Sequence, residues 1–303
     1  MSIKRILLLP HLHIQNANAL SSPYTIGFPA LTAWLGAVHA LQRKLITAGF
    51  EDLLFTKVGV VCHWLDLQTY KGRGDYVYSI IGTGNPLDKD GNRSAFIEEA
   101  RCHLDVSLII ECEGVNPFTQ NQLQEQVNLQ LLGGLKFAGG DLLSVGNVDF
   151  HVIDDEVSER KLKRQLMPGY ALIERRELMI EAMQQGQDAL DALLDYLSIK
   201  HRSEIDDEGR VTWTSKRKTS GWLVPIATGF HGIAPLIPPG ETLNQRDPET
   251  PHRFAEAVVT LGEFVMPYRL NALDELLWHY HYDEFSNLYL CQQSLSITQN
   301  LNV

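Results

Sequence analysis

Apolar positions at the start of the chain change from a continuous run to a helical spacing. Residues 3–9 are almost continuously apolar, which is typical of a buried strand, and we expect Pro10 to end it because proline has no backbone N–H for a ladder. Pro29 suits the first turn of a helix. An apolar stripe then predicts a helix over residues 30–47, which Gly49 stops.

Strand patterns dominate the next hundred residues. Residues 53–70 and 76–81 are rich in β-favouring side chains on either side of a Lys-Gly-Arg-Gly turn, which predicts a hairpin. Residues 99–108 alternate strictly between polar and apolar positions, which predicts a strand with one apolar and one polar face. The apolar face would carry Ala100, Cys102, Leu104, Val106 and Leu108, and the polar face Glu99, Arg101, His103, Asp105 and Ser107.

The second half mixes helical and extended patterns. Thr119 and Gln122 have the spacing of a capping box for a helix that ends at Gly133-Gly134. Short β segments should follow up to about residue 153, then a strand over 169–173 and a helix over 175–197 that Gly186 weakens. Residues 198–220 read as a polar surface insertion and 221–226 as extended. Helices are predicted around 254–264 and 270–280.

This succession of elements favours an α+β fold. Strands and helices alternate without regular βαβ spacing, which argues against a doubly wound sheet. The order β, α, β-hairpin, β, α, β in the first half is compatible with a ferredoxin-like core. The length fits one elaborated domain or two small ones. We predict a single domain over 1–303, with its core mainly within 1–175 and an elaboration over 176–303.

Charge and cysteine usage narrow the class of protein. A net charge of −11 argues against broad, sequence-independent binding to phosphate backbones. A local basic cluster at Arg160, Lys161, Lys163 and Arg164 permits a small nucleic-acid footprint, or is simply solvated charge. The apolar run at the N-terminus is too short for a signal peptide or a membrane span. The four cysteines lack zinc or disulfide spacing, so we expect a cytoplasmic protein with reduced thiols and no cofactor.

The candidate binding residues come from an uncharged polar segment, from a glycine pair and from the polar face of the strand predicted over 99–108. Between Pro10 and Pro29 no side chain is acidic or lysine or arginine, and amides and hydroxyls there suit base edges, ribose or another backbone, unless they only satisfy their own turns. The Gly139-Gly140 pair would let a phosphate approach backbone N–H groups, or is a plain turn. The polar row with Arg101 and His103 is a binding face or only the wet side of a sheet. These candidates are Gln15, Asn16, Asn18, Ser21, Arg101, His103, Gly139 and Gly140.

Signals for common catalytic and metal sites are missing. The sequence has no Walker loop, no GxSxG elbow and no HExxH helix. The pairs His11/His13 and His279/His281 each lack a third ligand nearby in sequence, so no metal site is expected.

Eight blocks, in order over essentially the whole chain, resemble one known family. The longest is LLLPHLHIQNANALSSPYTIGFPALTA over residues 7–33, and the others are HALQR (39–43), VGVVCH (58–63), NPL (85–87), RCHLDVSL (101–108), PGYAL (168–172), GWLVPI (221–226) and RDPETPHRF (246–254). They are similar to the second Csy subunit of type I-F CRISPR surveillance complexes.

The resemblance implies a protein of the RAMP superfamily with a ferredoxin-like, RNA-recognition-type core. It implies a non-catalytic subunit that pairs with the large subunit, holds the 5′ handle of the CRISPR RNA and abuts the first repeated backbone subunit. An indirect contact with target DNA stays open, and no membrane is involved. Family positions add Arg246 and Arg253 to the candidates. Two alternatives stay open: a metal-independent ribonuclease of the same superfamily, using His103 or His13, and an adaptor that binds only protein.

Overall fold

The computed structural model describes residues 3–81, 87–92, 99–205, 207–245 and 247–293. Its helices are α1 (Leu31–Thr47), α2 (Gln120–Leu132), α3 (Glu156–Gln165), α4 (Arg176–Gln184) and α5 (Ala189–Leu197), with short 3-10 turns η1 (Pro267–Arg269) and η2 (Leu273–Leu276). Its strands are β1 (Lys4–Asn18), β2 (Leu20–Ser22), β3 (Thr25–Ile26), β4 (Leu54–Leu67), β5 (Thr69–Tyr70), β6 (Ser79–Ile80), β7 (Arg101–Glu113), β8 (Lys136–Phe137), β9 (Gly140–Ser144), β10 (Asp149–Ile153), β11 (Tyr170–Glu174), β12 (Lys200–Ile205), β13 (Val211–Lys216), β14 (Leu223–Gly232), β15 (Ala255–Val265), β16 (Leu277–Asp283) and β17 (Leu288–Gln293).

The fold is mixed α/β and is built on a large sheet. Among the described residues, eleven strands form one sheet in the order β11-β15-β14-β17-β16-β4-β7-β1-β9-β8, with β10 also paired to β1. Strand β7 is antiparallel to both β1 and β4, so β1 and β4 run parallel on either side of it. Four strands from the C-terminal part, β14 to β17, continue the sheet that the N-terminal strands begin.

The outer edge of β4 closes part of this sheet into a ring. Along that edge β4 pairs first with β16 and then with β11, and β11 leads back through β15, β14 and β17 to β16. The buried Trp278 indole N–H donates to the Leu172 carbonyl at 2.9 Å, joining β16 to β11. Glu174 and Gln293 exchange backbone and side-chain hydrogen bonds across the ring, and burial raises the pKa of the Glu174 carboxyl.

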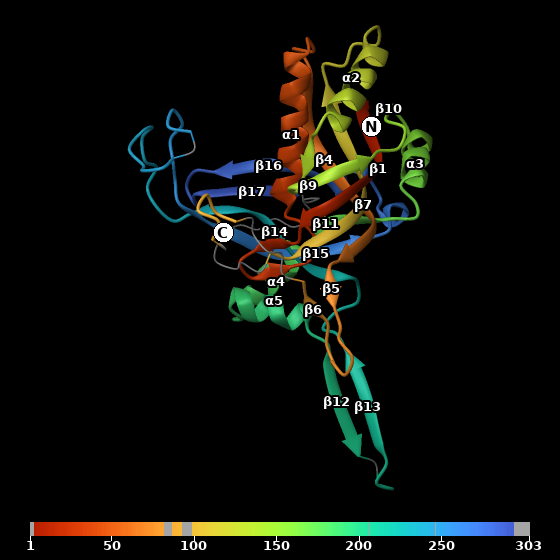
Figure 1. Cartoon of the computed structure of the whole chain (residues 1–303). Helices are drawn as coiled ribbons and strands as arrows, with labels where there is room; N and C mark the ends of the chain where they lie inside the picture. The colour runs from red at the N-terminus through yellow and green to blue at the C-terminus, as the bar shows by residue number, and fades with distance from the viewer. Residues whose placement is uncertain (1–2, 82–86, 93–98, 206, 246, 294–303) are drawn as a thin grey trace.

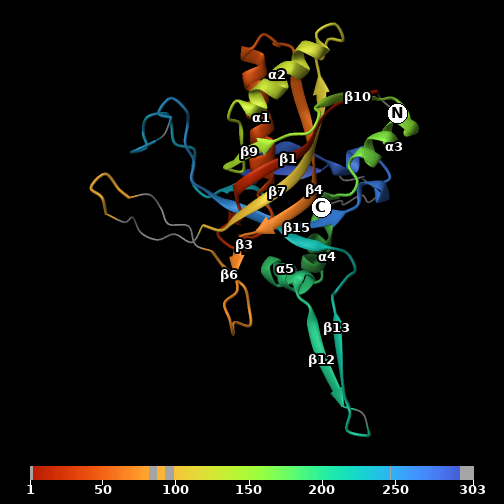
Figure 2. The ribbon, with the colours of Figure 1, turned by 45° about the vertical axis from the view of Figure 1, so that its right-hand side comes forward.

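The main core lies between the sheet and two helices. Leu104, Val106 and Leu108 of β7 pack with buried side chains of α1 and α2, so these helices cover one face. On the opposite face only one end is apolar, where α3 and η2 pack over Ile6, Leu8 and Ile109. Figures 1 and 2 show α1 and α2 together on one side and α3 on the other. At the other end of that second face, which is polar and which we call the open face, none of the helices in the described part of the chain packs.

Strand β1 corrects the expectation that Pro10 ends the first strand. The strand continues to Asn18 because two irregularities in its pairing with β7, between Leu9 and Leu12 and between Ile14 and Ala17, absorb the residues that do not fit the ladder. His11 and Asn16 lie within them with positive φ angles of 50° and 57°. Each bulge reverses the face of the sheet to which the following side chains point. This reversal keeps Leu12, Ile14 and Ala17 in the core. The uncharged segment is therefore largely strand and not a connection.

Several predicted elements are confirmed. Helix α1 and the alternating strand β7 lie where their patterns place them, and β5 and β6 form the hairpin across residues 71–78. Residues 198–220 do form an exposed insertion, and β12 and β13 make it a hairpin that projects from the body of the molecule (Figure 2).

Other predictions were wrong. The helix expected over 175–197 is two helices, α4 and α5, because Gly186 takes a left-handed φ of 95° between them. Thr119 precedes α2 but its side chain makes no capping hydrogen bond. The helix expected around 254–264 is strand β15, and the one expected around 270–280 is the 3-10 turn η2 followed by the start of strand β16. The Val258-Val259-Thr260 run and the aromatic Trp-His-Tyr-His-Tyr run favour extended backbone, and both strands belong to the ring.

Candidate functional site

Asn16 is the centre of a hydrogen-bonded cluster on the polar end of the open face. Its backbone N–H donates to His103 Nδ1 at 3.2 Å, and its carbonyl accepts from Arg101 Nη1 at 3.3 Å. Gln68, which follows β4, donates from Nε2 to the Asn16 side-chain oxygen at 2.7 Å. The bulge conformation of Asn16 is what presents its backbone N–H and carbonyl to β7 in this way, and asparagine tolerates that conformation better than most residues.

His103 and Arg101 are held in place by this cluster. His103 accepts at Nδ1 from Asn16, and its Nε2 lies 3.3 Å from the Gln68 amide nitrogen. Arg101 is also paired with Glu99. Both side chains remain partly exposed beside the exposed Gln15 and Asn16. The arrangement offers amide groups and one guanidinium on a surface whose shape is set by hydrogen bonds.

Asn18 and Ser21 support the turn that follows. The Asn18 side chain accepts from Leu20 N–H at 3.0 Å and donates to the Leu20 carbonyl at 3.1 Å. Ser21 Oγ lies 2.9 Å from Thr25 Oγ1 across the small β2–β3 hairpin. The described contacts of Asn18 and Ser21 thus lie within their own turns. This agrees with the alternative that these polar side chains only satisfy the turns in which they lie.

The glycine pair lies against the same end of β1. The Asn18 N–H donates to the Ala138 carbonyl at 2.8 Å, so the β8–β9 turn crosses the end of β1. Gly139 is exposed with a φ of 75°, whereas Gly140 is buried against the backbone of β1. Asn18, Ser21, Gly139 and Lys136 share a surface cavity of about 370 Å³ with the start of α1.

Substitutions at the two glycines should separate the close packing of Gly140 against β1 from the exposed turn at Gly139. A Cβ at position 140 would lie 2.7 Å from the Gln15 carbonyl oxygen and 2.8 Å from the Ala17 nitrogen, so Gly140→Ala should cost about 1–3 kcal/mol of unfolding free energy. A Cβ at position 139 would meet no atom within 4 Å, and asparagine suits a left-handed φ, so Gly139→Asn should cost less than about 1 kcal/mol. Urea unfolding of both variants measures this, and equal costs would contradict the close approach of β9 to β1.

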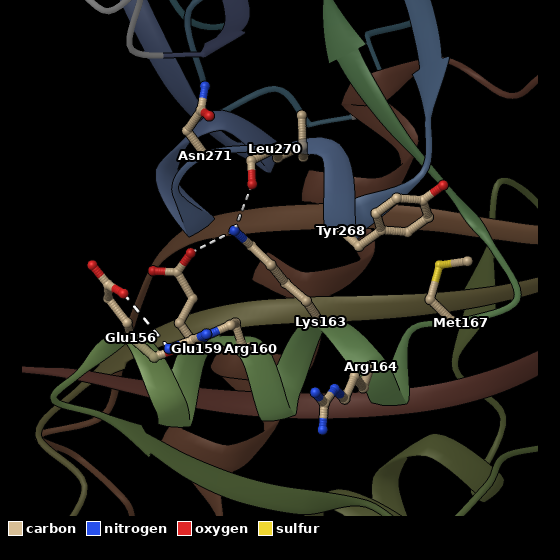
Figure 3. A pocket seen from close by; sticks show the side chains of 9 residues that line it. All are labelled: Glu156, Glu159, Arg160, Lys163, Arg164, Met167, Tyr268, Leu270 and Asn271. Atoms are coloured by element: carbon tan, nitrogen blue, oxygen red, sulfur yellow. Dashed lines mark hydrogen bonds and ion pairs between the residues drawn. The ribbon is translucent and has the colours of Figure 1, made fainter.

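The basic cluster lies on α3, apart from the Asn16 cluster, and its four side chains differ in their surroundings. Figure 3 shows three of them, Arg160, Lys163 and Arg164. Lys163 is buried, pairs with Glu159 at 2.5 Å and donates to the Leu270 carbonyl at 2.8 Å. Arg160 is exposed and pairs with Glu156 at 3.6 Å, while Lys161 and Arg164 are exposed. Arg160 and Arg164 line a surface cavity of about 680 Å³ with Tyr268 and Asn271. The structure thus gives Lys163 an interior, structural environment instead of a surface one.

The two remaining candidates lie in the C-terminal part. Arg253 donates to the Asn287 side chain at 2.6 Å and packs against Gly232, so it braces the turn between β16 and β17. Arg246 lies outside the described residues.

Comparison with known proteins decides the family. A family model described as CRISPR-associated protein (Cas_Csy2) matches residues 7–291. The chain belongs to this Csy2 family. A relative named CRISPR-associated protein Csy2, from Pseudomonas aeruginosa strain UCBPP-PA14, is 37% identical over 311 residues, covering 94% of this chain and 94% of that protein. The resemblance noted in the sequence is therefore confirmed, and the chain is a protein of the type I-F Csy complex, which serves antiviral defence.

Within the residues that the structure describes, no helix has the length and apolar character needed to cross a membrane.

Sequence reasoning missed Gln68, which joins Asn16 to His103. Its only signal is a polar residue at the end of a β-favouring run, and nothing local marks it.

Proposed function

We propose that this chain is a non-catalytic subunit that, with the large subunit of the complex, holds the 5′ handle of the CRISPR RNA. The handle would lie across the open polar end of the sheet, and the chain would abut the first backbone subunit. The observation that carries the proposal is the Asn16 cluster, in which Asn16, Arg101 and His103 are held by mutual hydrogen bonds on an exposed face. Splayed bases of a single strand offer edges to amide and guanidinium groups of this kind.

The strand order supports an RNA-recognition-type core for this face. In a ferredoxin-like fold two parallel strands flank an antiparallel one, with helices on one side of the sheet. Here β4-β7-β1 have that arrangement, β9 and β10 follow on the far side of β1, and α1 and α2 cover one face. The opposite face, where single strands bind in such folds, carries Asn16 and His103. We propose that this core and its C-terminal strands form one RAMP-type domain.

Charge supports recognition by uncharged groups. The chain carries 37 acidic against 26 basic side chains, and Arg101 is already paired with Glu99. Few phosphates can then be neutralised by this chain alone, so amides would supply much of the contact. The binding constant should depend only weakly on salt, since each neutralised phosphate contributes a slope of about −0.7 for single strands.

Geometry does not favour His103 as the general base of the ribonuclease alternative. The Nδ1 atom of His103 already accepts from the Asn16 backbone, and its Nε2 faces the Gln68 amide. A general base needs a nitrogen within reach of the substrate proton. Precursor RNA incubated with the protein in chelator should therefore remain intact, and discrete cleavage lost on changing His103 or His13 would support the enzyme instead.

Binding of handle RNA by the co-expressed pair of this chain and the large subunit tests the proposal. Fluorescence anisotropy should show at least about tenfold tighter binding of a handle-containing RNA than of a scrambled RNA of equal length. Equal affinities would contradict specific recognition. Thio-substituted guide RNA should crosslink to this chain within the complex, whereas crosslinks to other subunits alone would favour a protein-binding adaptor.

A further inference from the structure

Four side chains that could bind a metal ion gather on the open face, next to the Asn16 cluster. They come from three neighbouring strands: His11 and His13 from β1, His63 from β4 and Asp105 from β7. One ligand atom from each of His11, His63 and Asp105 lies within 4.8 Å of the others. His11 Nδ1 is 3.1 Å from both Asp105 carboxylate oxygens, and His13 Nδ1 is 3.9 Å from one of them.

The backbone brings the two central histidines to this point through bulges. His11 lies in the irregularity between Leu9 and Leu12 with a left-handed φ of 50°. His63 lies in a second irregularity, between Cys62 and Trp64, where β4 pairs with β7. Bulges re-aim side chains and are frequent beside functional sites. A left-handed φ is uncommon for residues other than glycine, although histidine adopts it more often than most, and it costs energy that the surrounding structure must offset.

Hydrogen bonds at both ring nitrogens orient the His63 side chain. Its Nδ1 lies 2.6 Å from the Pro168 carbonyl, to which the N–H can donate, and Nε2 is then the nitrogen without a proton. Histidines that bind metals commonly donate their second ring N–H to a carbonyl, which orients the ring. Ser107, which is buried, lies 2.7 Å from Nε2 and also accepts the His11 backbone N–H at 3.0 Å. The serine thus contacts both histidines, and an ion bound at His63 Nε2 would replace it as the partner of that nitrogen.

The hydrogen bonds of this cluster do not account for all the contacts among its histidines and its carboxylate. One carboxylate faces two histidines, and the rings of His11 and His63 stack with centroids 4.2 Å apart. The side chains of His11 and His13 are about half exposed, so an ion can reach them from solvent. Imidazole nitrogens with one carboxylate oxygen are a common ligand set for Zn²⁺ and other divalent transition metals.

We propose that His11, His63 and Asp105 bind a divalent transition-metal ion, with Zn²⁺ the best match, and that His13 can serve as the fourth ligand. Tetrahedral Zn²⁺ holds nitrogen and oxygen ligands at about 2.0–2.2 Å. Closing the cluster to these distances requires small side-chain rotations, because the three ligand atoms already lie within 4.8 Å. The ion would join β1, β4 and β7 across the face and tie the loop at Pro168 to them through His63.

Metal binding is tested on the full chain in its pair with the large subunit. After dialysis against EDTA, Zn²⁺ is titrated in competition with a chromophoric chelator. The titration should show one tight site for each copy of this chain. The variants His11→Asn and Asp105→Asn should weaken it about 100-fold or more, as loss of a direct ligand exceeds the 10–100-fold typical of outer partners. Asparagine at position 11 suits the left-handed backbone. The control His201→Ala, on the exposed β12, should bind Zn²⁺ like the wild type.

Two further measurements on the unaltered protein keep the test independent of the variants. Co²⁺ should give the visible absorption of a four- or five-coordinate site, which Zn²⁺ abolishes. Zn²⁺ should raise the melting temperature of the wild type but not of the two ligand variants. Absence of stoichiometric binding by the wild type, or equal binding by the Asp105→Asn variant, would overturn the proposal.

Discussion

Combining Gln15→Ala with Asn16→Gly should weaken binding of the 5′-handle RNA about 100-fold while the chain still pairs with the large subunit. Each base contact by an amide is worth about 1–3 kcal/mol, and about 1.4 kcal/mol corresponds to a factor of ten, so loss of two contacts gives this magnitude. Glycine at position 16 keeps the positive φ of 57° without a side chain. Anisotropy with handle RNA, on the co-expressed pair, measures the change.

Two amides on the opposite face provide the matched control. Asn121 and Gln122 are exposed on α2, on the side of the sheet that the helices cover. Changing both to alanine should leave handle affinity within about twofold of the wild type. Unchanged affinity in the Gln15/Asn16 variant would show that the amides do not read the RNA. Failure of that variant to pair with the large subunit would identify the segment as a protein interface.

Replacing Lys163 with alanine should lower the free energy of unfolding by about 3–5 kcal/mol. The change leaves Glu159 buried without its cation, and removal of one partner of a buried ion pair costs this much. It also leaves the Leu270 carbonyl without its donor. Chemical denaturation of the full chain measures the loss.

Two companion variants show whether the ion pair is responsible. Lys161→Ala, exposed on the same helix, should change stability by no more than about 0.5 kcal/mol. The double variant Lys163→Met with Glu159→Leu removes both charges and should recover most of the lost stability. If Lys163→Ala unfolds like the wild type but binds handle RNA poorly, its ammonium group serves the RNA and the structural role is wrong.

Periodicity predicted those elements whose side chains face one core. Helix α1 has a single apolar face, so its pattern is regular and its limits fall within one residue of those expected. Strand β7 alternates at its start as expected, but it continues to Glu113 because Ile109 packs in the core on the second face as well. Strands β15 and β16 lie within a closed ring, where neighbouring strands supply contacts that no local pattern encodes. The bulges at His11 and Asn16 escaped prediction for the same reason, since only the register against β7 reveals them.

The candidate site was predicted in composition but not in arrangement. Gln15, Asn16, Arg101 and His103 were chosen as separate groups, and pairing of β1 with β7 brings them together. Lys163 looks the same as Lys161 in the sequence, because burial depends on the position of η1 and Leu270 more than a hundred residues later. The grouping of His63 with His11 depends on three strands and has no local signal.

The closed strand ring has a consequence for the order in which the chain can fold during synthesis. Residues 4–113 supply β1, β4 and β7, which pair with one another and need no later part of the chain to do so. The outer edge of β4 pairs with β16, which is made more than 160 residues later, and until then its backbone groups offer an open template for other chains. Protection of this nascent edge, by a chaperone or by an early partner subunit, should therefore raise the yield of native protein.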